Sequence, residues 1–360
     1  PRLFKLRKKK KILVLNDYNL ENDIKLHRSG KLPAHLTFGL PKLEQLGFDC
    51  ELIRLWEPGF LYHADNFLIR HKPFIPIGRL ESQVKALRRV NRACAILSLK
   101  ETESNLLHYM RAIGLIEIPV ITLVHHSQDI GRFARLRAPF YRLWNKGADA
   151  VLTFSERVKL VNANDSKKVT IRWGPDIPYY DSLNPSYGKA IVTSGRSGRD
   201  FDTFASACIK NEVPARIYCT NNDLSERLTN LPNFINCEVG WQTPQVAIAK
   251  QKDSLAIAIP LHSQPFTSGL TSLCDAFGFG KAILMPDNPG IDFDIEGLGI
   301  GKVVSPNNLS GWNQTLQWVK EHPEKIKEMG KRAKSYARKH YNSDIFVEQV
   351  AKVLLKSINH

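Results

Sequence analysis

The sequence predicts an α/β protein made of two doubly wound domains, each with a parallel sheet covered by helices on both faces. Short runs rich in Val, Ile and Leu alternate with segments of helical spacing, a pattern typical of parallel strands buried on both sides. The alternation runs twice through the chain, with one segment rich in proline and glycine between the two series. A chain of 360 residues also suits two domains of roughly 150–180 residues better than one.

In the first half, the expected strands are separated by helical patterns such as residues 40–46 and 82–92. These strands cover residues 11–15, 50–55, 95–99, 119–125, 148–154 and 168–172. The second half repeats the arrangement, with strands expected at residues 189–193, 215–219, 234–239, 254–261, 281–285 and 301–304. Two helices are expected to close the chain, over residues 325–340 and, after an N-cap at Asn342–Asp344, over residues 345–358.

The segment from Trp173 to Gly188 divides the two series. Its three prolines and two glycines in sixteen residues predict a linker or hinge loop. We therefore expect a first domain over residues 1–172, a linker over 173–188 and a second domain over 189–340. No strand follows the last helix, so residues 341–360 are expected to pack outside the second sheet.

The positive charge of the chain is concentrated in its first half. Residues 1–180 carry 31 Lys and Arg against 17 Asp and Glu, a net charge of +14, whereas residues 181–360 carry 20 against 18, a net charge of +2. A basic surface attracts an anionic membrane, nucleic acid or acidic substrates. The simpler alternative is a solvated basic leader, since residues 1–11 alone supply seven positive charges.

Composition excludes several classes of protein. Apolar residues make up 43% of the chain and charged residues 24%, as in soluble globular proteins. The apolar runs are much shorter than the roughly 20 residues that span a bilayer, and no signal peptide is expected because the run after the basic leader stops at Asn16. Six scattered cysteines without a Cys-x-x-Cys pair indicate reduced thiols in a cytosol rather than disulfides or a zinc site.

The loop after the first strand of the second half carries a candidate anion site. The strand ends in Ser194-Gly195-Arg196-Ser197-Gly198-Arg199-Asp200. Glycine lets the backbone approach an anion closely, and arginine can bind phosphate through two parallel N–H groups. Gly195, Arg196 and Arg199 are therefore candidate phosphate ligands, although an exposed turn with solvated arginines would have the same sequence.

A second candidate site is the stretch from Ser268 to Lys281, which leads directly into the apolar run 282–285. A turn of small residues opens a helix that carries one carboxylate, Asp275, and a glycine precedes the next strand. Backbone N–H groups at a helix N-terminus bind phosphate, and an acid can bind ribose hydroxyls. The N–H groups around Gly269, Leu270 and Thr271 are thus expected to face a nucleotide.

Two histidines, His125 and His126, follow the apolar run 120–124, where open α/β sheets place ligand-binding residues. A neutral imidazole there could hydrogen-bond a sugar hydroxyl or handle a proton near pH 7. His125 is the preferred candidate. The run from Arg132 to Trp144 interleaves cations with aromatic residues, which suits a helix lying on an anionic membrane, but equally a helix that packs its aromatic side chains on the sheet.

Residues 189–350 and the segment Trp173-Gly174-Pro175-Asp176 resemble GT-B glycosyltransferases of the family 4-like type (glycosyl transferases group 1), including bacterial glycan-assembly members. The resemblance is thinner over residues 1–170, where strand order and His125 carry it. It implies two Rossmann-like domains that face a central cleft, with a C-terminal helix crossing back to the first domain. It also implies transfer of a sugar from a nucleotide-diphosphate sugar to a glycan or lipid-linked acceptor, with retention of configuration.

The resemblance assigns roles by position in this sequence. Relatives usually carry two glutamates eight positions apart, which correspond here to Thr267 and Asp275. Asp275 keeps an acid for the ribose, whereas Thr267 does not keep the acid that contacts the donor sugar. The catalytic residues implied are His125, Arg196 and Asp275. The donor-binding residues implied are Gly195, Arg196, Arg199, Gly240, Thr267, Ser268, Gly269, Leu270, Thr271 and Asp275.

On the acceptor side, the resemblance implies contacts from Gly30, His35 and His126, the first two from the loop 29–36. The implied partners are a nucleotide-sugar donor, a glycan or lipid-linked acceptor and an anionic membrane surface, with no nucleic acid. The implied location is the cytoplasm, at the inner face of the membrane. Domain closure about residues 173–188 would exclude water from the reaction.

No metal or other cofactor is expected. Two Asp-x-Asp motifs, Asp200-Phe-Asp202 and Asp292-Phe-Asp294, could indicate a metal-dependent glycosyltransferase, but neither follows a buried strand directly. Two alternatives to a transferase stay open. A sugar-nucleotide epimerase of the same fold would use the same diphosphate site, and a non-catalytic protein that binds polyanions or glycans would account for the basic half and for Thr267.

Overall fold

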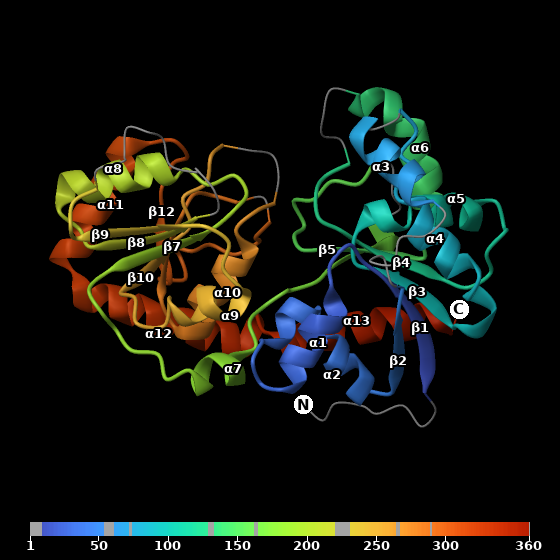
Figure 1. Ribbon diagram of the computed structural model, residues 1–360, viewed down its shortest axis with the longest axis horizontal. Coiled ribbons are helices and arrows are strands. Elements are labelled where there is room, and N and C mark those ends of the chain that lie inside the picture. The colour runs from blue at the N-terminus through green and yellow to red at the C-terminus, as the bar shows by residue number, and fades with distance from the viewer. Residues whose placement is uncertain are drawn as a thin grey trace. The chain divides into compact units, whose positions relative to one another are not determined.

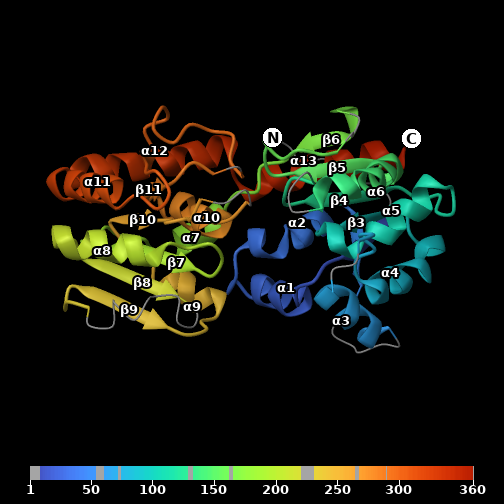
Figure 2. The ribbon, with the colours of Figure 1, turned by 90° about the horizontal axis from the view of Figure 1, so that it is seen from above.

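The computed structural model describes residues 9–53, 61–71, 74–128, 133–161, 165–219, 231–263, 267–288 and 290–359. In this part of the chain there are two six-stranded sheets, and neighbouring strands in both run parallel. Each strand overlaps one of the apolar runs that predict it. The predicted α/β class with two parallel sheets is therefore confirmed (Figures 1 and 2).

The chain divides into two compact units. The first contains the described residues of 1–29, 34–173 and 344–360, and the second contains those of 30–33 and 174–343. The last helix, α13 (Ser343–Ile358), thus belongs mainly to the first unit. There, the Gln349 side chain accepts a hydrogen bond from the Arg172 backbone N–H at 2.9 Å, and Asp344 pairs with Lys42 at 2.7 Å.

The first sheet has the strand order β2-β1-β3-β4-β5-β6. Its strands are β1 Lys10–Leu15, β2 Phe48–Leu52, β3 Ala95–Ser98, β4 Val120–Val124, β5 Ala150–Thr153 and β6 Lys168–Thr170. Strand β1 lies between β2 and β3. The connection from β1 to β2 therefore leads toward one edge of the sheet, and the connection from β3 to β4 leads toward the other. Such a switch point opens a crevice at the carboxyl edge of a parallel sheet.

Helices α4 and α5 pack against β1, β3 and β4 through a continuous apolar cluster. The helices of the first unit besides α13 are α1 Leu20–Arg28, α2 Leu40–Gln45, α3 Tyr62–His71, α4 Leu80–Leu87, α5 Asn105–Ala112 and α6 Ala134–Gly147. Short 3-10 turns are η1 Ala34–Thr37, η2 Val90–Arg92, η3 Glu101–Glu103 and η4 Asp165–Lys167. The apolar cluster contains Leu13, Leu15, Ile53, Ala86, Ile96, Leu107, Ile116 and Val120.

The second sheet has the strand order β12-β11-β10-β7-β8-β9. Its strands are β7 Ile191–Gly195, β8 Ala215–Cys219, β9 Ile235–Val239, β10 Ala256–Ala258, β11 Ala282–Met285 and β12 Gly301–Val303. Here the switch point lies between β7 and β10. The loops that follow these two strands therefore border the crevice of the second unit.

The helices of the second unit cover both faces of its sheet (Figure 1). They are α7 Ile177–Ser182, α8 Phe201–Asn211, α9 Pro244–Ala249, α10 Leu270–Phe279, α11 Leu309–Glu321 and α12 Pro323–His340. Phe204 of α8 and Trp312 of α11 meet edge to face at 5.3 Å within the core of one face. Helix α10 is apolar on nearly every side, because it is enclosed by the sheet, α7 and α12.

Residues 174–188, the second part of the predicted linker, are held on the second unit by several contacts. Tyr180 is fully buried, and the Tyr187 hydroxyl donates to the carbonyl of Gly280 at 2.8 Å. Asp181 pairs with Lys334 and Arg338 of α12. A proline-rich composition predicts a turn-rich segment but gives no information on these contacts.

Candidate functional site

The loops after β7 and β10 bring together most of the candidate phosphate ligands of the second unit. Gly195 ends β7 with a φ of 143°, and Gly269 precedes α10 with a φ of 79°. Both conformations favour glycine. A Cβ atom at position 195 would also lie 2.5 Å from Nε of Arg199, so glycine lets that guanidinium group lie against the backbone.

The guanidinium group of Arg199 connects the two loops. Its Nε donates to the Ser194 carbonyl at 3.1 Å, and its Nη2 donates to the Ser272 hydroxyl at 3.0 Å. Burial lowers the pKa of Arg199 to about 10, which leaves the group cationic at neutral pH. No carboxylate in the described residues forms an ion pair with it. Arg199 is half-buried, and a partly desolvated cation without an anionic partner is costly, so an anionic ligand would lower that cost.

Helix α10 points its N-terminus at the same crevice. The Gly269 N-cap has no side chain to bond the first N–H groups of the helix, and Thr271 is exposed in the first turn. Ser268 and Thr267 lie half-buried just before the helix, and the Ser268 carbonyl accepts a hydrogen bond from Asn288 at 2.6 Å. A helix start of this kind stabilises phosphate through its dipole and N–H groups.

Arg196 lies outside this buried cluster. Its side chain is exposed and stacks on the indole ring of Trp241, with Cζ 4.9 Å from the ring centroid. Trp241 follows Gly240 at the end of β9 and is 68% exposed. The sequence analysis missed Trp241, although a tryptophan directly after the end of a predicted strand was a signal that could have identified it.

Asp275 requires a correction. Its carboxylate is 3% exposed and accepts hydrogen bonds from the Tyr180 hydroxyl at 2.6 Å and from the Gln251 amide at 2.9 Å. Burial raises its pKa to about 6, against the opposing effect of these two hydrogen bonds. The carboxylate is therefore not an exposed acid as the sequence analysis expects, because both oxygens bind side chains inside the second unit. Its contact with a ribose and its catalytic role stay predictions.

In the first unit, His125 follows β4 at the carboxyl edge of the sheet. Its ring stacks on Phe154 at 5.2 Å, and Phe154 in turn contacts Trp173 at 5.7 Å. Burial lowers the pKa of His125 to about 4, so the imidazole is neutral at pH 7. A neutral imidazole held by aromatic packing suits a hydrogen bond to a sugar hydroxyl.

His35 also requires a correction. It lies in η1 with its ring wholly buried against Trp173 at 5.5 Å, and its carbonyl accepts a hydrogen bond from the Trp173 indole. Burial lowers its pKa to about 3. The ring is therefore not in an open loop as the sequence analysis expects, because η1 encloses it against Trp173. Its contact with an acceptor stays a prediction.

The other acceptor-side candidates are accessible. Gly30 is exposed in the turn after α1 with a φ of 73°, and a Cβ atom there would meet nothing within 4 Å. His126 is half-buried beside His125, and burial lowers its pKa. The acceptor contacts expected of Gly30 and His126 stay predictions.

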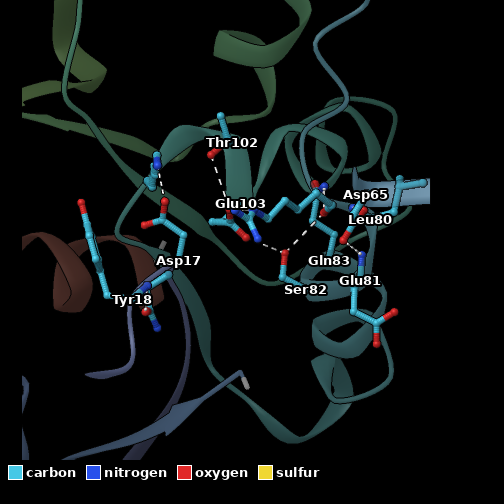
Figure 3. Close-up of polar contacts among 12 residues, drawn as sticks. Asp17, Tyr18, Asp65, Leu80, Glu81, Ser82, Gln83, Thr102 and Glu103 are labelled. Carbon is cyan, nitrogen blue, oxygen red and sulfur yellow. Dashed lines mark hydrogen bonds and ion pairs between the residues drawn. The ribbon is translucent and has the colours of Figure 1, made fainter. Parts of the chain in front are cut away.

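Two acids at the first crevice, Asp17 and Glu101, were missed by the sequence analysis. Asp17 follows β1 and pairs with Lys100, which follows β3 together with Glu101. Figure 3 shows Asp17 near the network that holds Glu103, in which Ser82 donates to Glu103 at 2.9 Å. The sequence contained a signal that could have identified these acids. Polar residues that follow two central strands lie at the edge of a parallel sheet where ligands bind.

One acid of each Asp-x-Asp motif bonds to backbone N–H groups. Asp200 accepts the Thr203 N–H at the start of α8, and Asp294 accepts those of Glu296 and Gly297. In the part of the chain that the structure describes, no group of three or more His, Cys, Asp or Glu is placed to hold a metal. Nor does any helix of that part have the length and apolar character needed to cross a membrane.

The run 132–144 divides between core and surface. Arg132 lies outside the described residues. Trp144 is buried against the ring of His108 at 3.9 Å, whereas Phe133 and Leu136 are exposed. The exposed face of α6 follows helical spacing and consists of Arg135, Leu136, Pro139, Arg142, Leu143 and Lys146.

Comparison with known proteins identifies the fold. No protein-family model matches the sequence, and no curated protein matches it. Among solved structures, HepE from Anabaena in complex with UDP and glucose is similar at 14% identity, over 96% of this chain and 100% of HepE, with a TM-score of 0.66. A glycosyltransferase from Rickettsia africae is similar at 13% identity, over 99% of this chain and 100% of that protein, with a TM-score of 0.66.

Sucrose-phosphate synthase from Thermosynechococcus elongatus is similar at 13% identity, over 96% of this chain and 98% of that protein, with a TM-score of 0.64. Each likeness extends over nearly the whole of both chains, so it covers both parallel sheets. The chain therefore has the GT-B fold that the sequence predicts.

Proposed function

We propose that this protein is a glycosyltransferase that moves a sugar from a nucleotide-diphosphate sugar to a glycan or lipid-linked acceptor. The observation that carries the proposal is Arg199, a half-buried cation without a carboxylate ion pair in the described residues, beside the N-terminus of α10 at the switch point of the second sheet. The complexes of HepE with UDP, with UDP and glucose, and with UDP-glucose support a donor of this class.

In this mechanism, Arg199 and the first N–H groups of α10 would offset the negative charge that develops on the leaving diphosphate. Fixed charges and dipoles of this kind stabilise a transition state without reorganising during the reaction. Arg196 would add a second cation from the exposed side, beside Trp241. We propose no metal cofactor, in keeping with Asp200 and Asp294, one acid of each Asp-x-Asp motif, which bind backbone N–H groups.

His125 is proposed to orient a hydroxyl group of the transferred sugar through its neutral imidazole. Retention of configuration is proposed only from the resemblance over residues 267–285. NMR of the anomeric proton in the first product formed would test retention against inversion.

The activity is tested by incubating the protein with UDP-, GDP-, dTDP- and ADP-sugars and separating the nucleotides by chromatography. We expect release of a nucleoside diphosphate from one donor class, faster when a glycan or lipid-linked acceptor is present, and little release by Arg199→Ala. An epimerised nucleotide-sugar formed without any acceptor would instead identify the epimerase alternative. If no donor is changed, with or without an acceptor, the result would contradict both the transferase proposal and the epimerase alternative.

We also propose that the exposed face of α6 contacts the anionic inner face of the cytoplasmic membrane. Its cations Arg135, Arg142 and Lys146 alternate with exposed apolar side chains, and Leu136 is 59% exposed. Such a face is attracted to anionic lipid and inserts its apolar groups.

In a vesicle sedimentation assay, the protein is expected to bind phosphatidylglycerol vesicles but not phosphatidylcholine vesicles. The double variant Arg135→Gln/Arg142→Gln should lose most of this binding, because each cation near the surface contributes about 1 kcal/mol. A matched control is Lys325→Gln/Lys331→Gln on the exposed side of α12 in the second unit. Equal loss in both double variants would show that total charge, and not this face, determines binding.

A further inference from the structure

We propose that Asp17, Glu101 and His125 form a binding site for the hydroxyl groups of an uncharged sugar at the carboxyl edge of the first sheet. The inference deepens the proposed function and rests on it for the role of that sugar as a substrate. The binding event itself concerns the first unit alone and can be measured without a nucleotide.

The topology places these residues on three neighbouring strands. Asp17 follows β1, Glu101 follows β3 and His125 follows β4, and these strands are adjacent in the order β1-β3-β4. The switch point of the first sheet lies between β1 and β3. Asp17 and Glu101 therefore come from the two loops that border its crevice, where open parallel sheets bind ligands.

Each of the three side chains has a buried polar atom without a hydrogen-bond partner in the described structure. These atoms are Oδ1 of Asp17, Oε2 of Glu101 and Nε2 of His125. The second oxygen of Asp17 bonds to Lys100, and the Glu101 carboxylate receives the backbone N–H of His125. Buried polar groups are normally satisfied, so three unsatisfied atoms at one sheet edge indicate a polar ligand.

The charges of the cluster define the chemistry of that ligand. Asp17 is neutralised by Lys100, His125 is uncharged at pH 7, and Glu101 is neutral or negative. The cluster has no excess positive charge, and the ionised form of Glu101 would repel a phosphate or carboxylate. Ionised carboxyl oxygens only accept hydrogen bonds, and the ligand must therefore supply donors, as the hydroxyl groups of a sugar do.

This conclusion differs from the simplest interpretation of the basic first half. The net charge of +14 over residues 1–180 suggests an acidic acceptor, but the crevice of that unit presents acids. Cations such as Arg135, Arg142 and Lys146 lie instead on the outer face of α6. An anionic part of a substrate or a membrane would contact that face, while the crevice takes neutral hydroxyl groups.

A second layer of contacts fixes the loop that carries Glu101. Glu103 is fully buried at the other end of η3, where it pairs with Arg79 at 3.1 Å and accepts a hydrogen bond from Ser82 (Figure 3). The Thr102 carbonyl accepts the Arg79 N–H at 2.9 Å. These contacts bind η3 to the start of α4, so Glu101 sits on a rigid support.

The groups around Glu101 predict how binding depends on pH. Burial raises the pKa of Glu101 to about 7. Lys100 on its own loop and Tyr141 on α6 have raised pKa values, His125 has a pKa of about 4, and burial lowers that of His126. Burial also raises the pKa of Glu103 to about 7, so Glu101 and Glu103 are both expected to change charge between pH 6 and 8. Of the two, Glu101 carries the unsatisfied oxygen of the proposed site, and its ionised form is the better acceptor.

The test is saturation-transfer NMR on the full chain with the methyl glycosides of glucose, galactose, mannose and N-acetylglucosamine. We expect saturation transfer to at least one neutral glycoside and none to glucose 6-phosphate. Glu101→Gln should raise the dissociation constant about tenfold or more, which is the loss of affinity expected when a hydrogen bond to a charged group is removed. The wild-type dissociation constant should rise as the pH falls from 8 to 6, and that of Glu101→Gln should rise much less, by the contribution of Glu103 alone.

Glu117→Gln is the matched control, because Glu117 is exposed before the start of β4, at the opposite edge of the sheet. Asp17→Asn provides a second variant in case Glu101→Gln does not fold. Nucleotide binding by Glu101→Gln should equal that of the wild type. The proposal is overturned if no neutral glycoside binds, or if binding in Glu101→Gln and Asp17→Asn equals that in Glu117→Gln. Either result leaves the nucleotide site unaffected.

The hydroxyl groups could belong to the transferred sugar or to the acceptor. Competition distinguishes the two sources, with UDP and UDP-glucose as the pair if the protein binds uridine nucleotides. Displacement of the glycoside by the nucleotide-sugar but not by the nucleotide assigns the site to the transferred sugar. Binding that persists in the presence of both assigns it to the acceptor.

Discussion

Replacement of Arg199 by alanine is expected to weaken nucleoside diphosphate binding by about 10- to 100-fold, the loss that corresponds to hydrogen bonds with a charged group. The side chain supplies a half-buried positive charge between the loops after β7 and β10. Isothermal titration calorimetry measures the effect directly. Arg199→Lys should restore only part of the affinity, because an ammonium group lacks the planar fork of a guanidinium group.

Arg332→Ala is the matched control for this experiment. Arg332 is exposed on α12 and donates to the Gly299 carbonyl, near the start of β12 and away from the carboxyl edge of the sheet. Its loss should leave nucleotide affinity unchanged. Equal affinities of Arg199→Ala and wild type would show that the nucleotide phosphates bind elsewhere.

Replacement of Asp275 by alanine is expected to destabilise the folded protein by about 3 kcal/mol without removing nucleotide binding. Two buried donors, the Tyr180 hydroxyl and the Gln251 amide, would lose their acceptor, and each such loss costs about 1–3 kcal/mol. Denaturant unfolding gives the change in free energy, with the exposed Asp49→Ala as a control. A loss of affinity as large as that of Arg199→Ala, in folded Asp275→Ala, would support the ribose-binding role.

The same carboxyl group contributes a pH dependence of definite sign. Its pKa is raised from 3.8 to about 6 in the folded protein, so the folded state binds the proton more tightly than the unfolded state. Its contribution to stability is therefore fully present below pH 4 and is lost as the pH rises through 6. The difference in unfolding free energy between wild type and Asp275→Asn should change between about pH 4 and pH 6, the two pKa values of the group, and stay constant at higher pH.

The strands were predictable because a strand buried on both faces must be apolar at nearly every position. The runs at 120–124 and 282–285 are continuous, and both form fully buried strands. The order of the strands along the chain was predictable, but their positions within each sheet were not, because those depend on which helices cross which face. The two switch points, which locate both crevices, therefore became visible only in the structure.

The candidate site was predictable where the backbone defines it and less so where side chains from distant segments meet. Gly195 and Gly269 have positive φ angles that a turn before a helix requires, and Arg199 follows from the same loop. Asp275 bonds to Tyr180, which is 95 residues away in the sequence, and no local pattern reports that contact. His35 was assigned to an open loop, but the 3-10 turn η1 encloses its ring against Trp173.

The central claim is that the second unit binds the nucleoside diphosphate of a sugar donor, and calorimetric titration of the full wild-type chain tests it most directly. UDP, GDP, dTDP, ADP and CMP are titrated separately, at low and at high salt. The account predicts one-to-one binding of at least one nucleoside diphosphate that persists at high salt, and its loss in Arg199→Ala. No binding of any of the five nucleotides, together with tight salt-sensitive binding of a polyanion such as heparin, would contradict it.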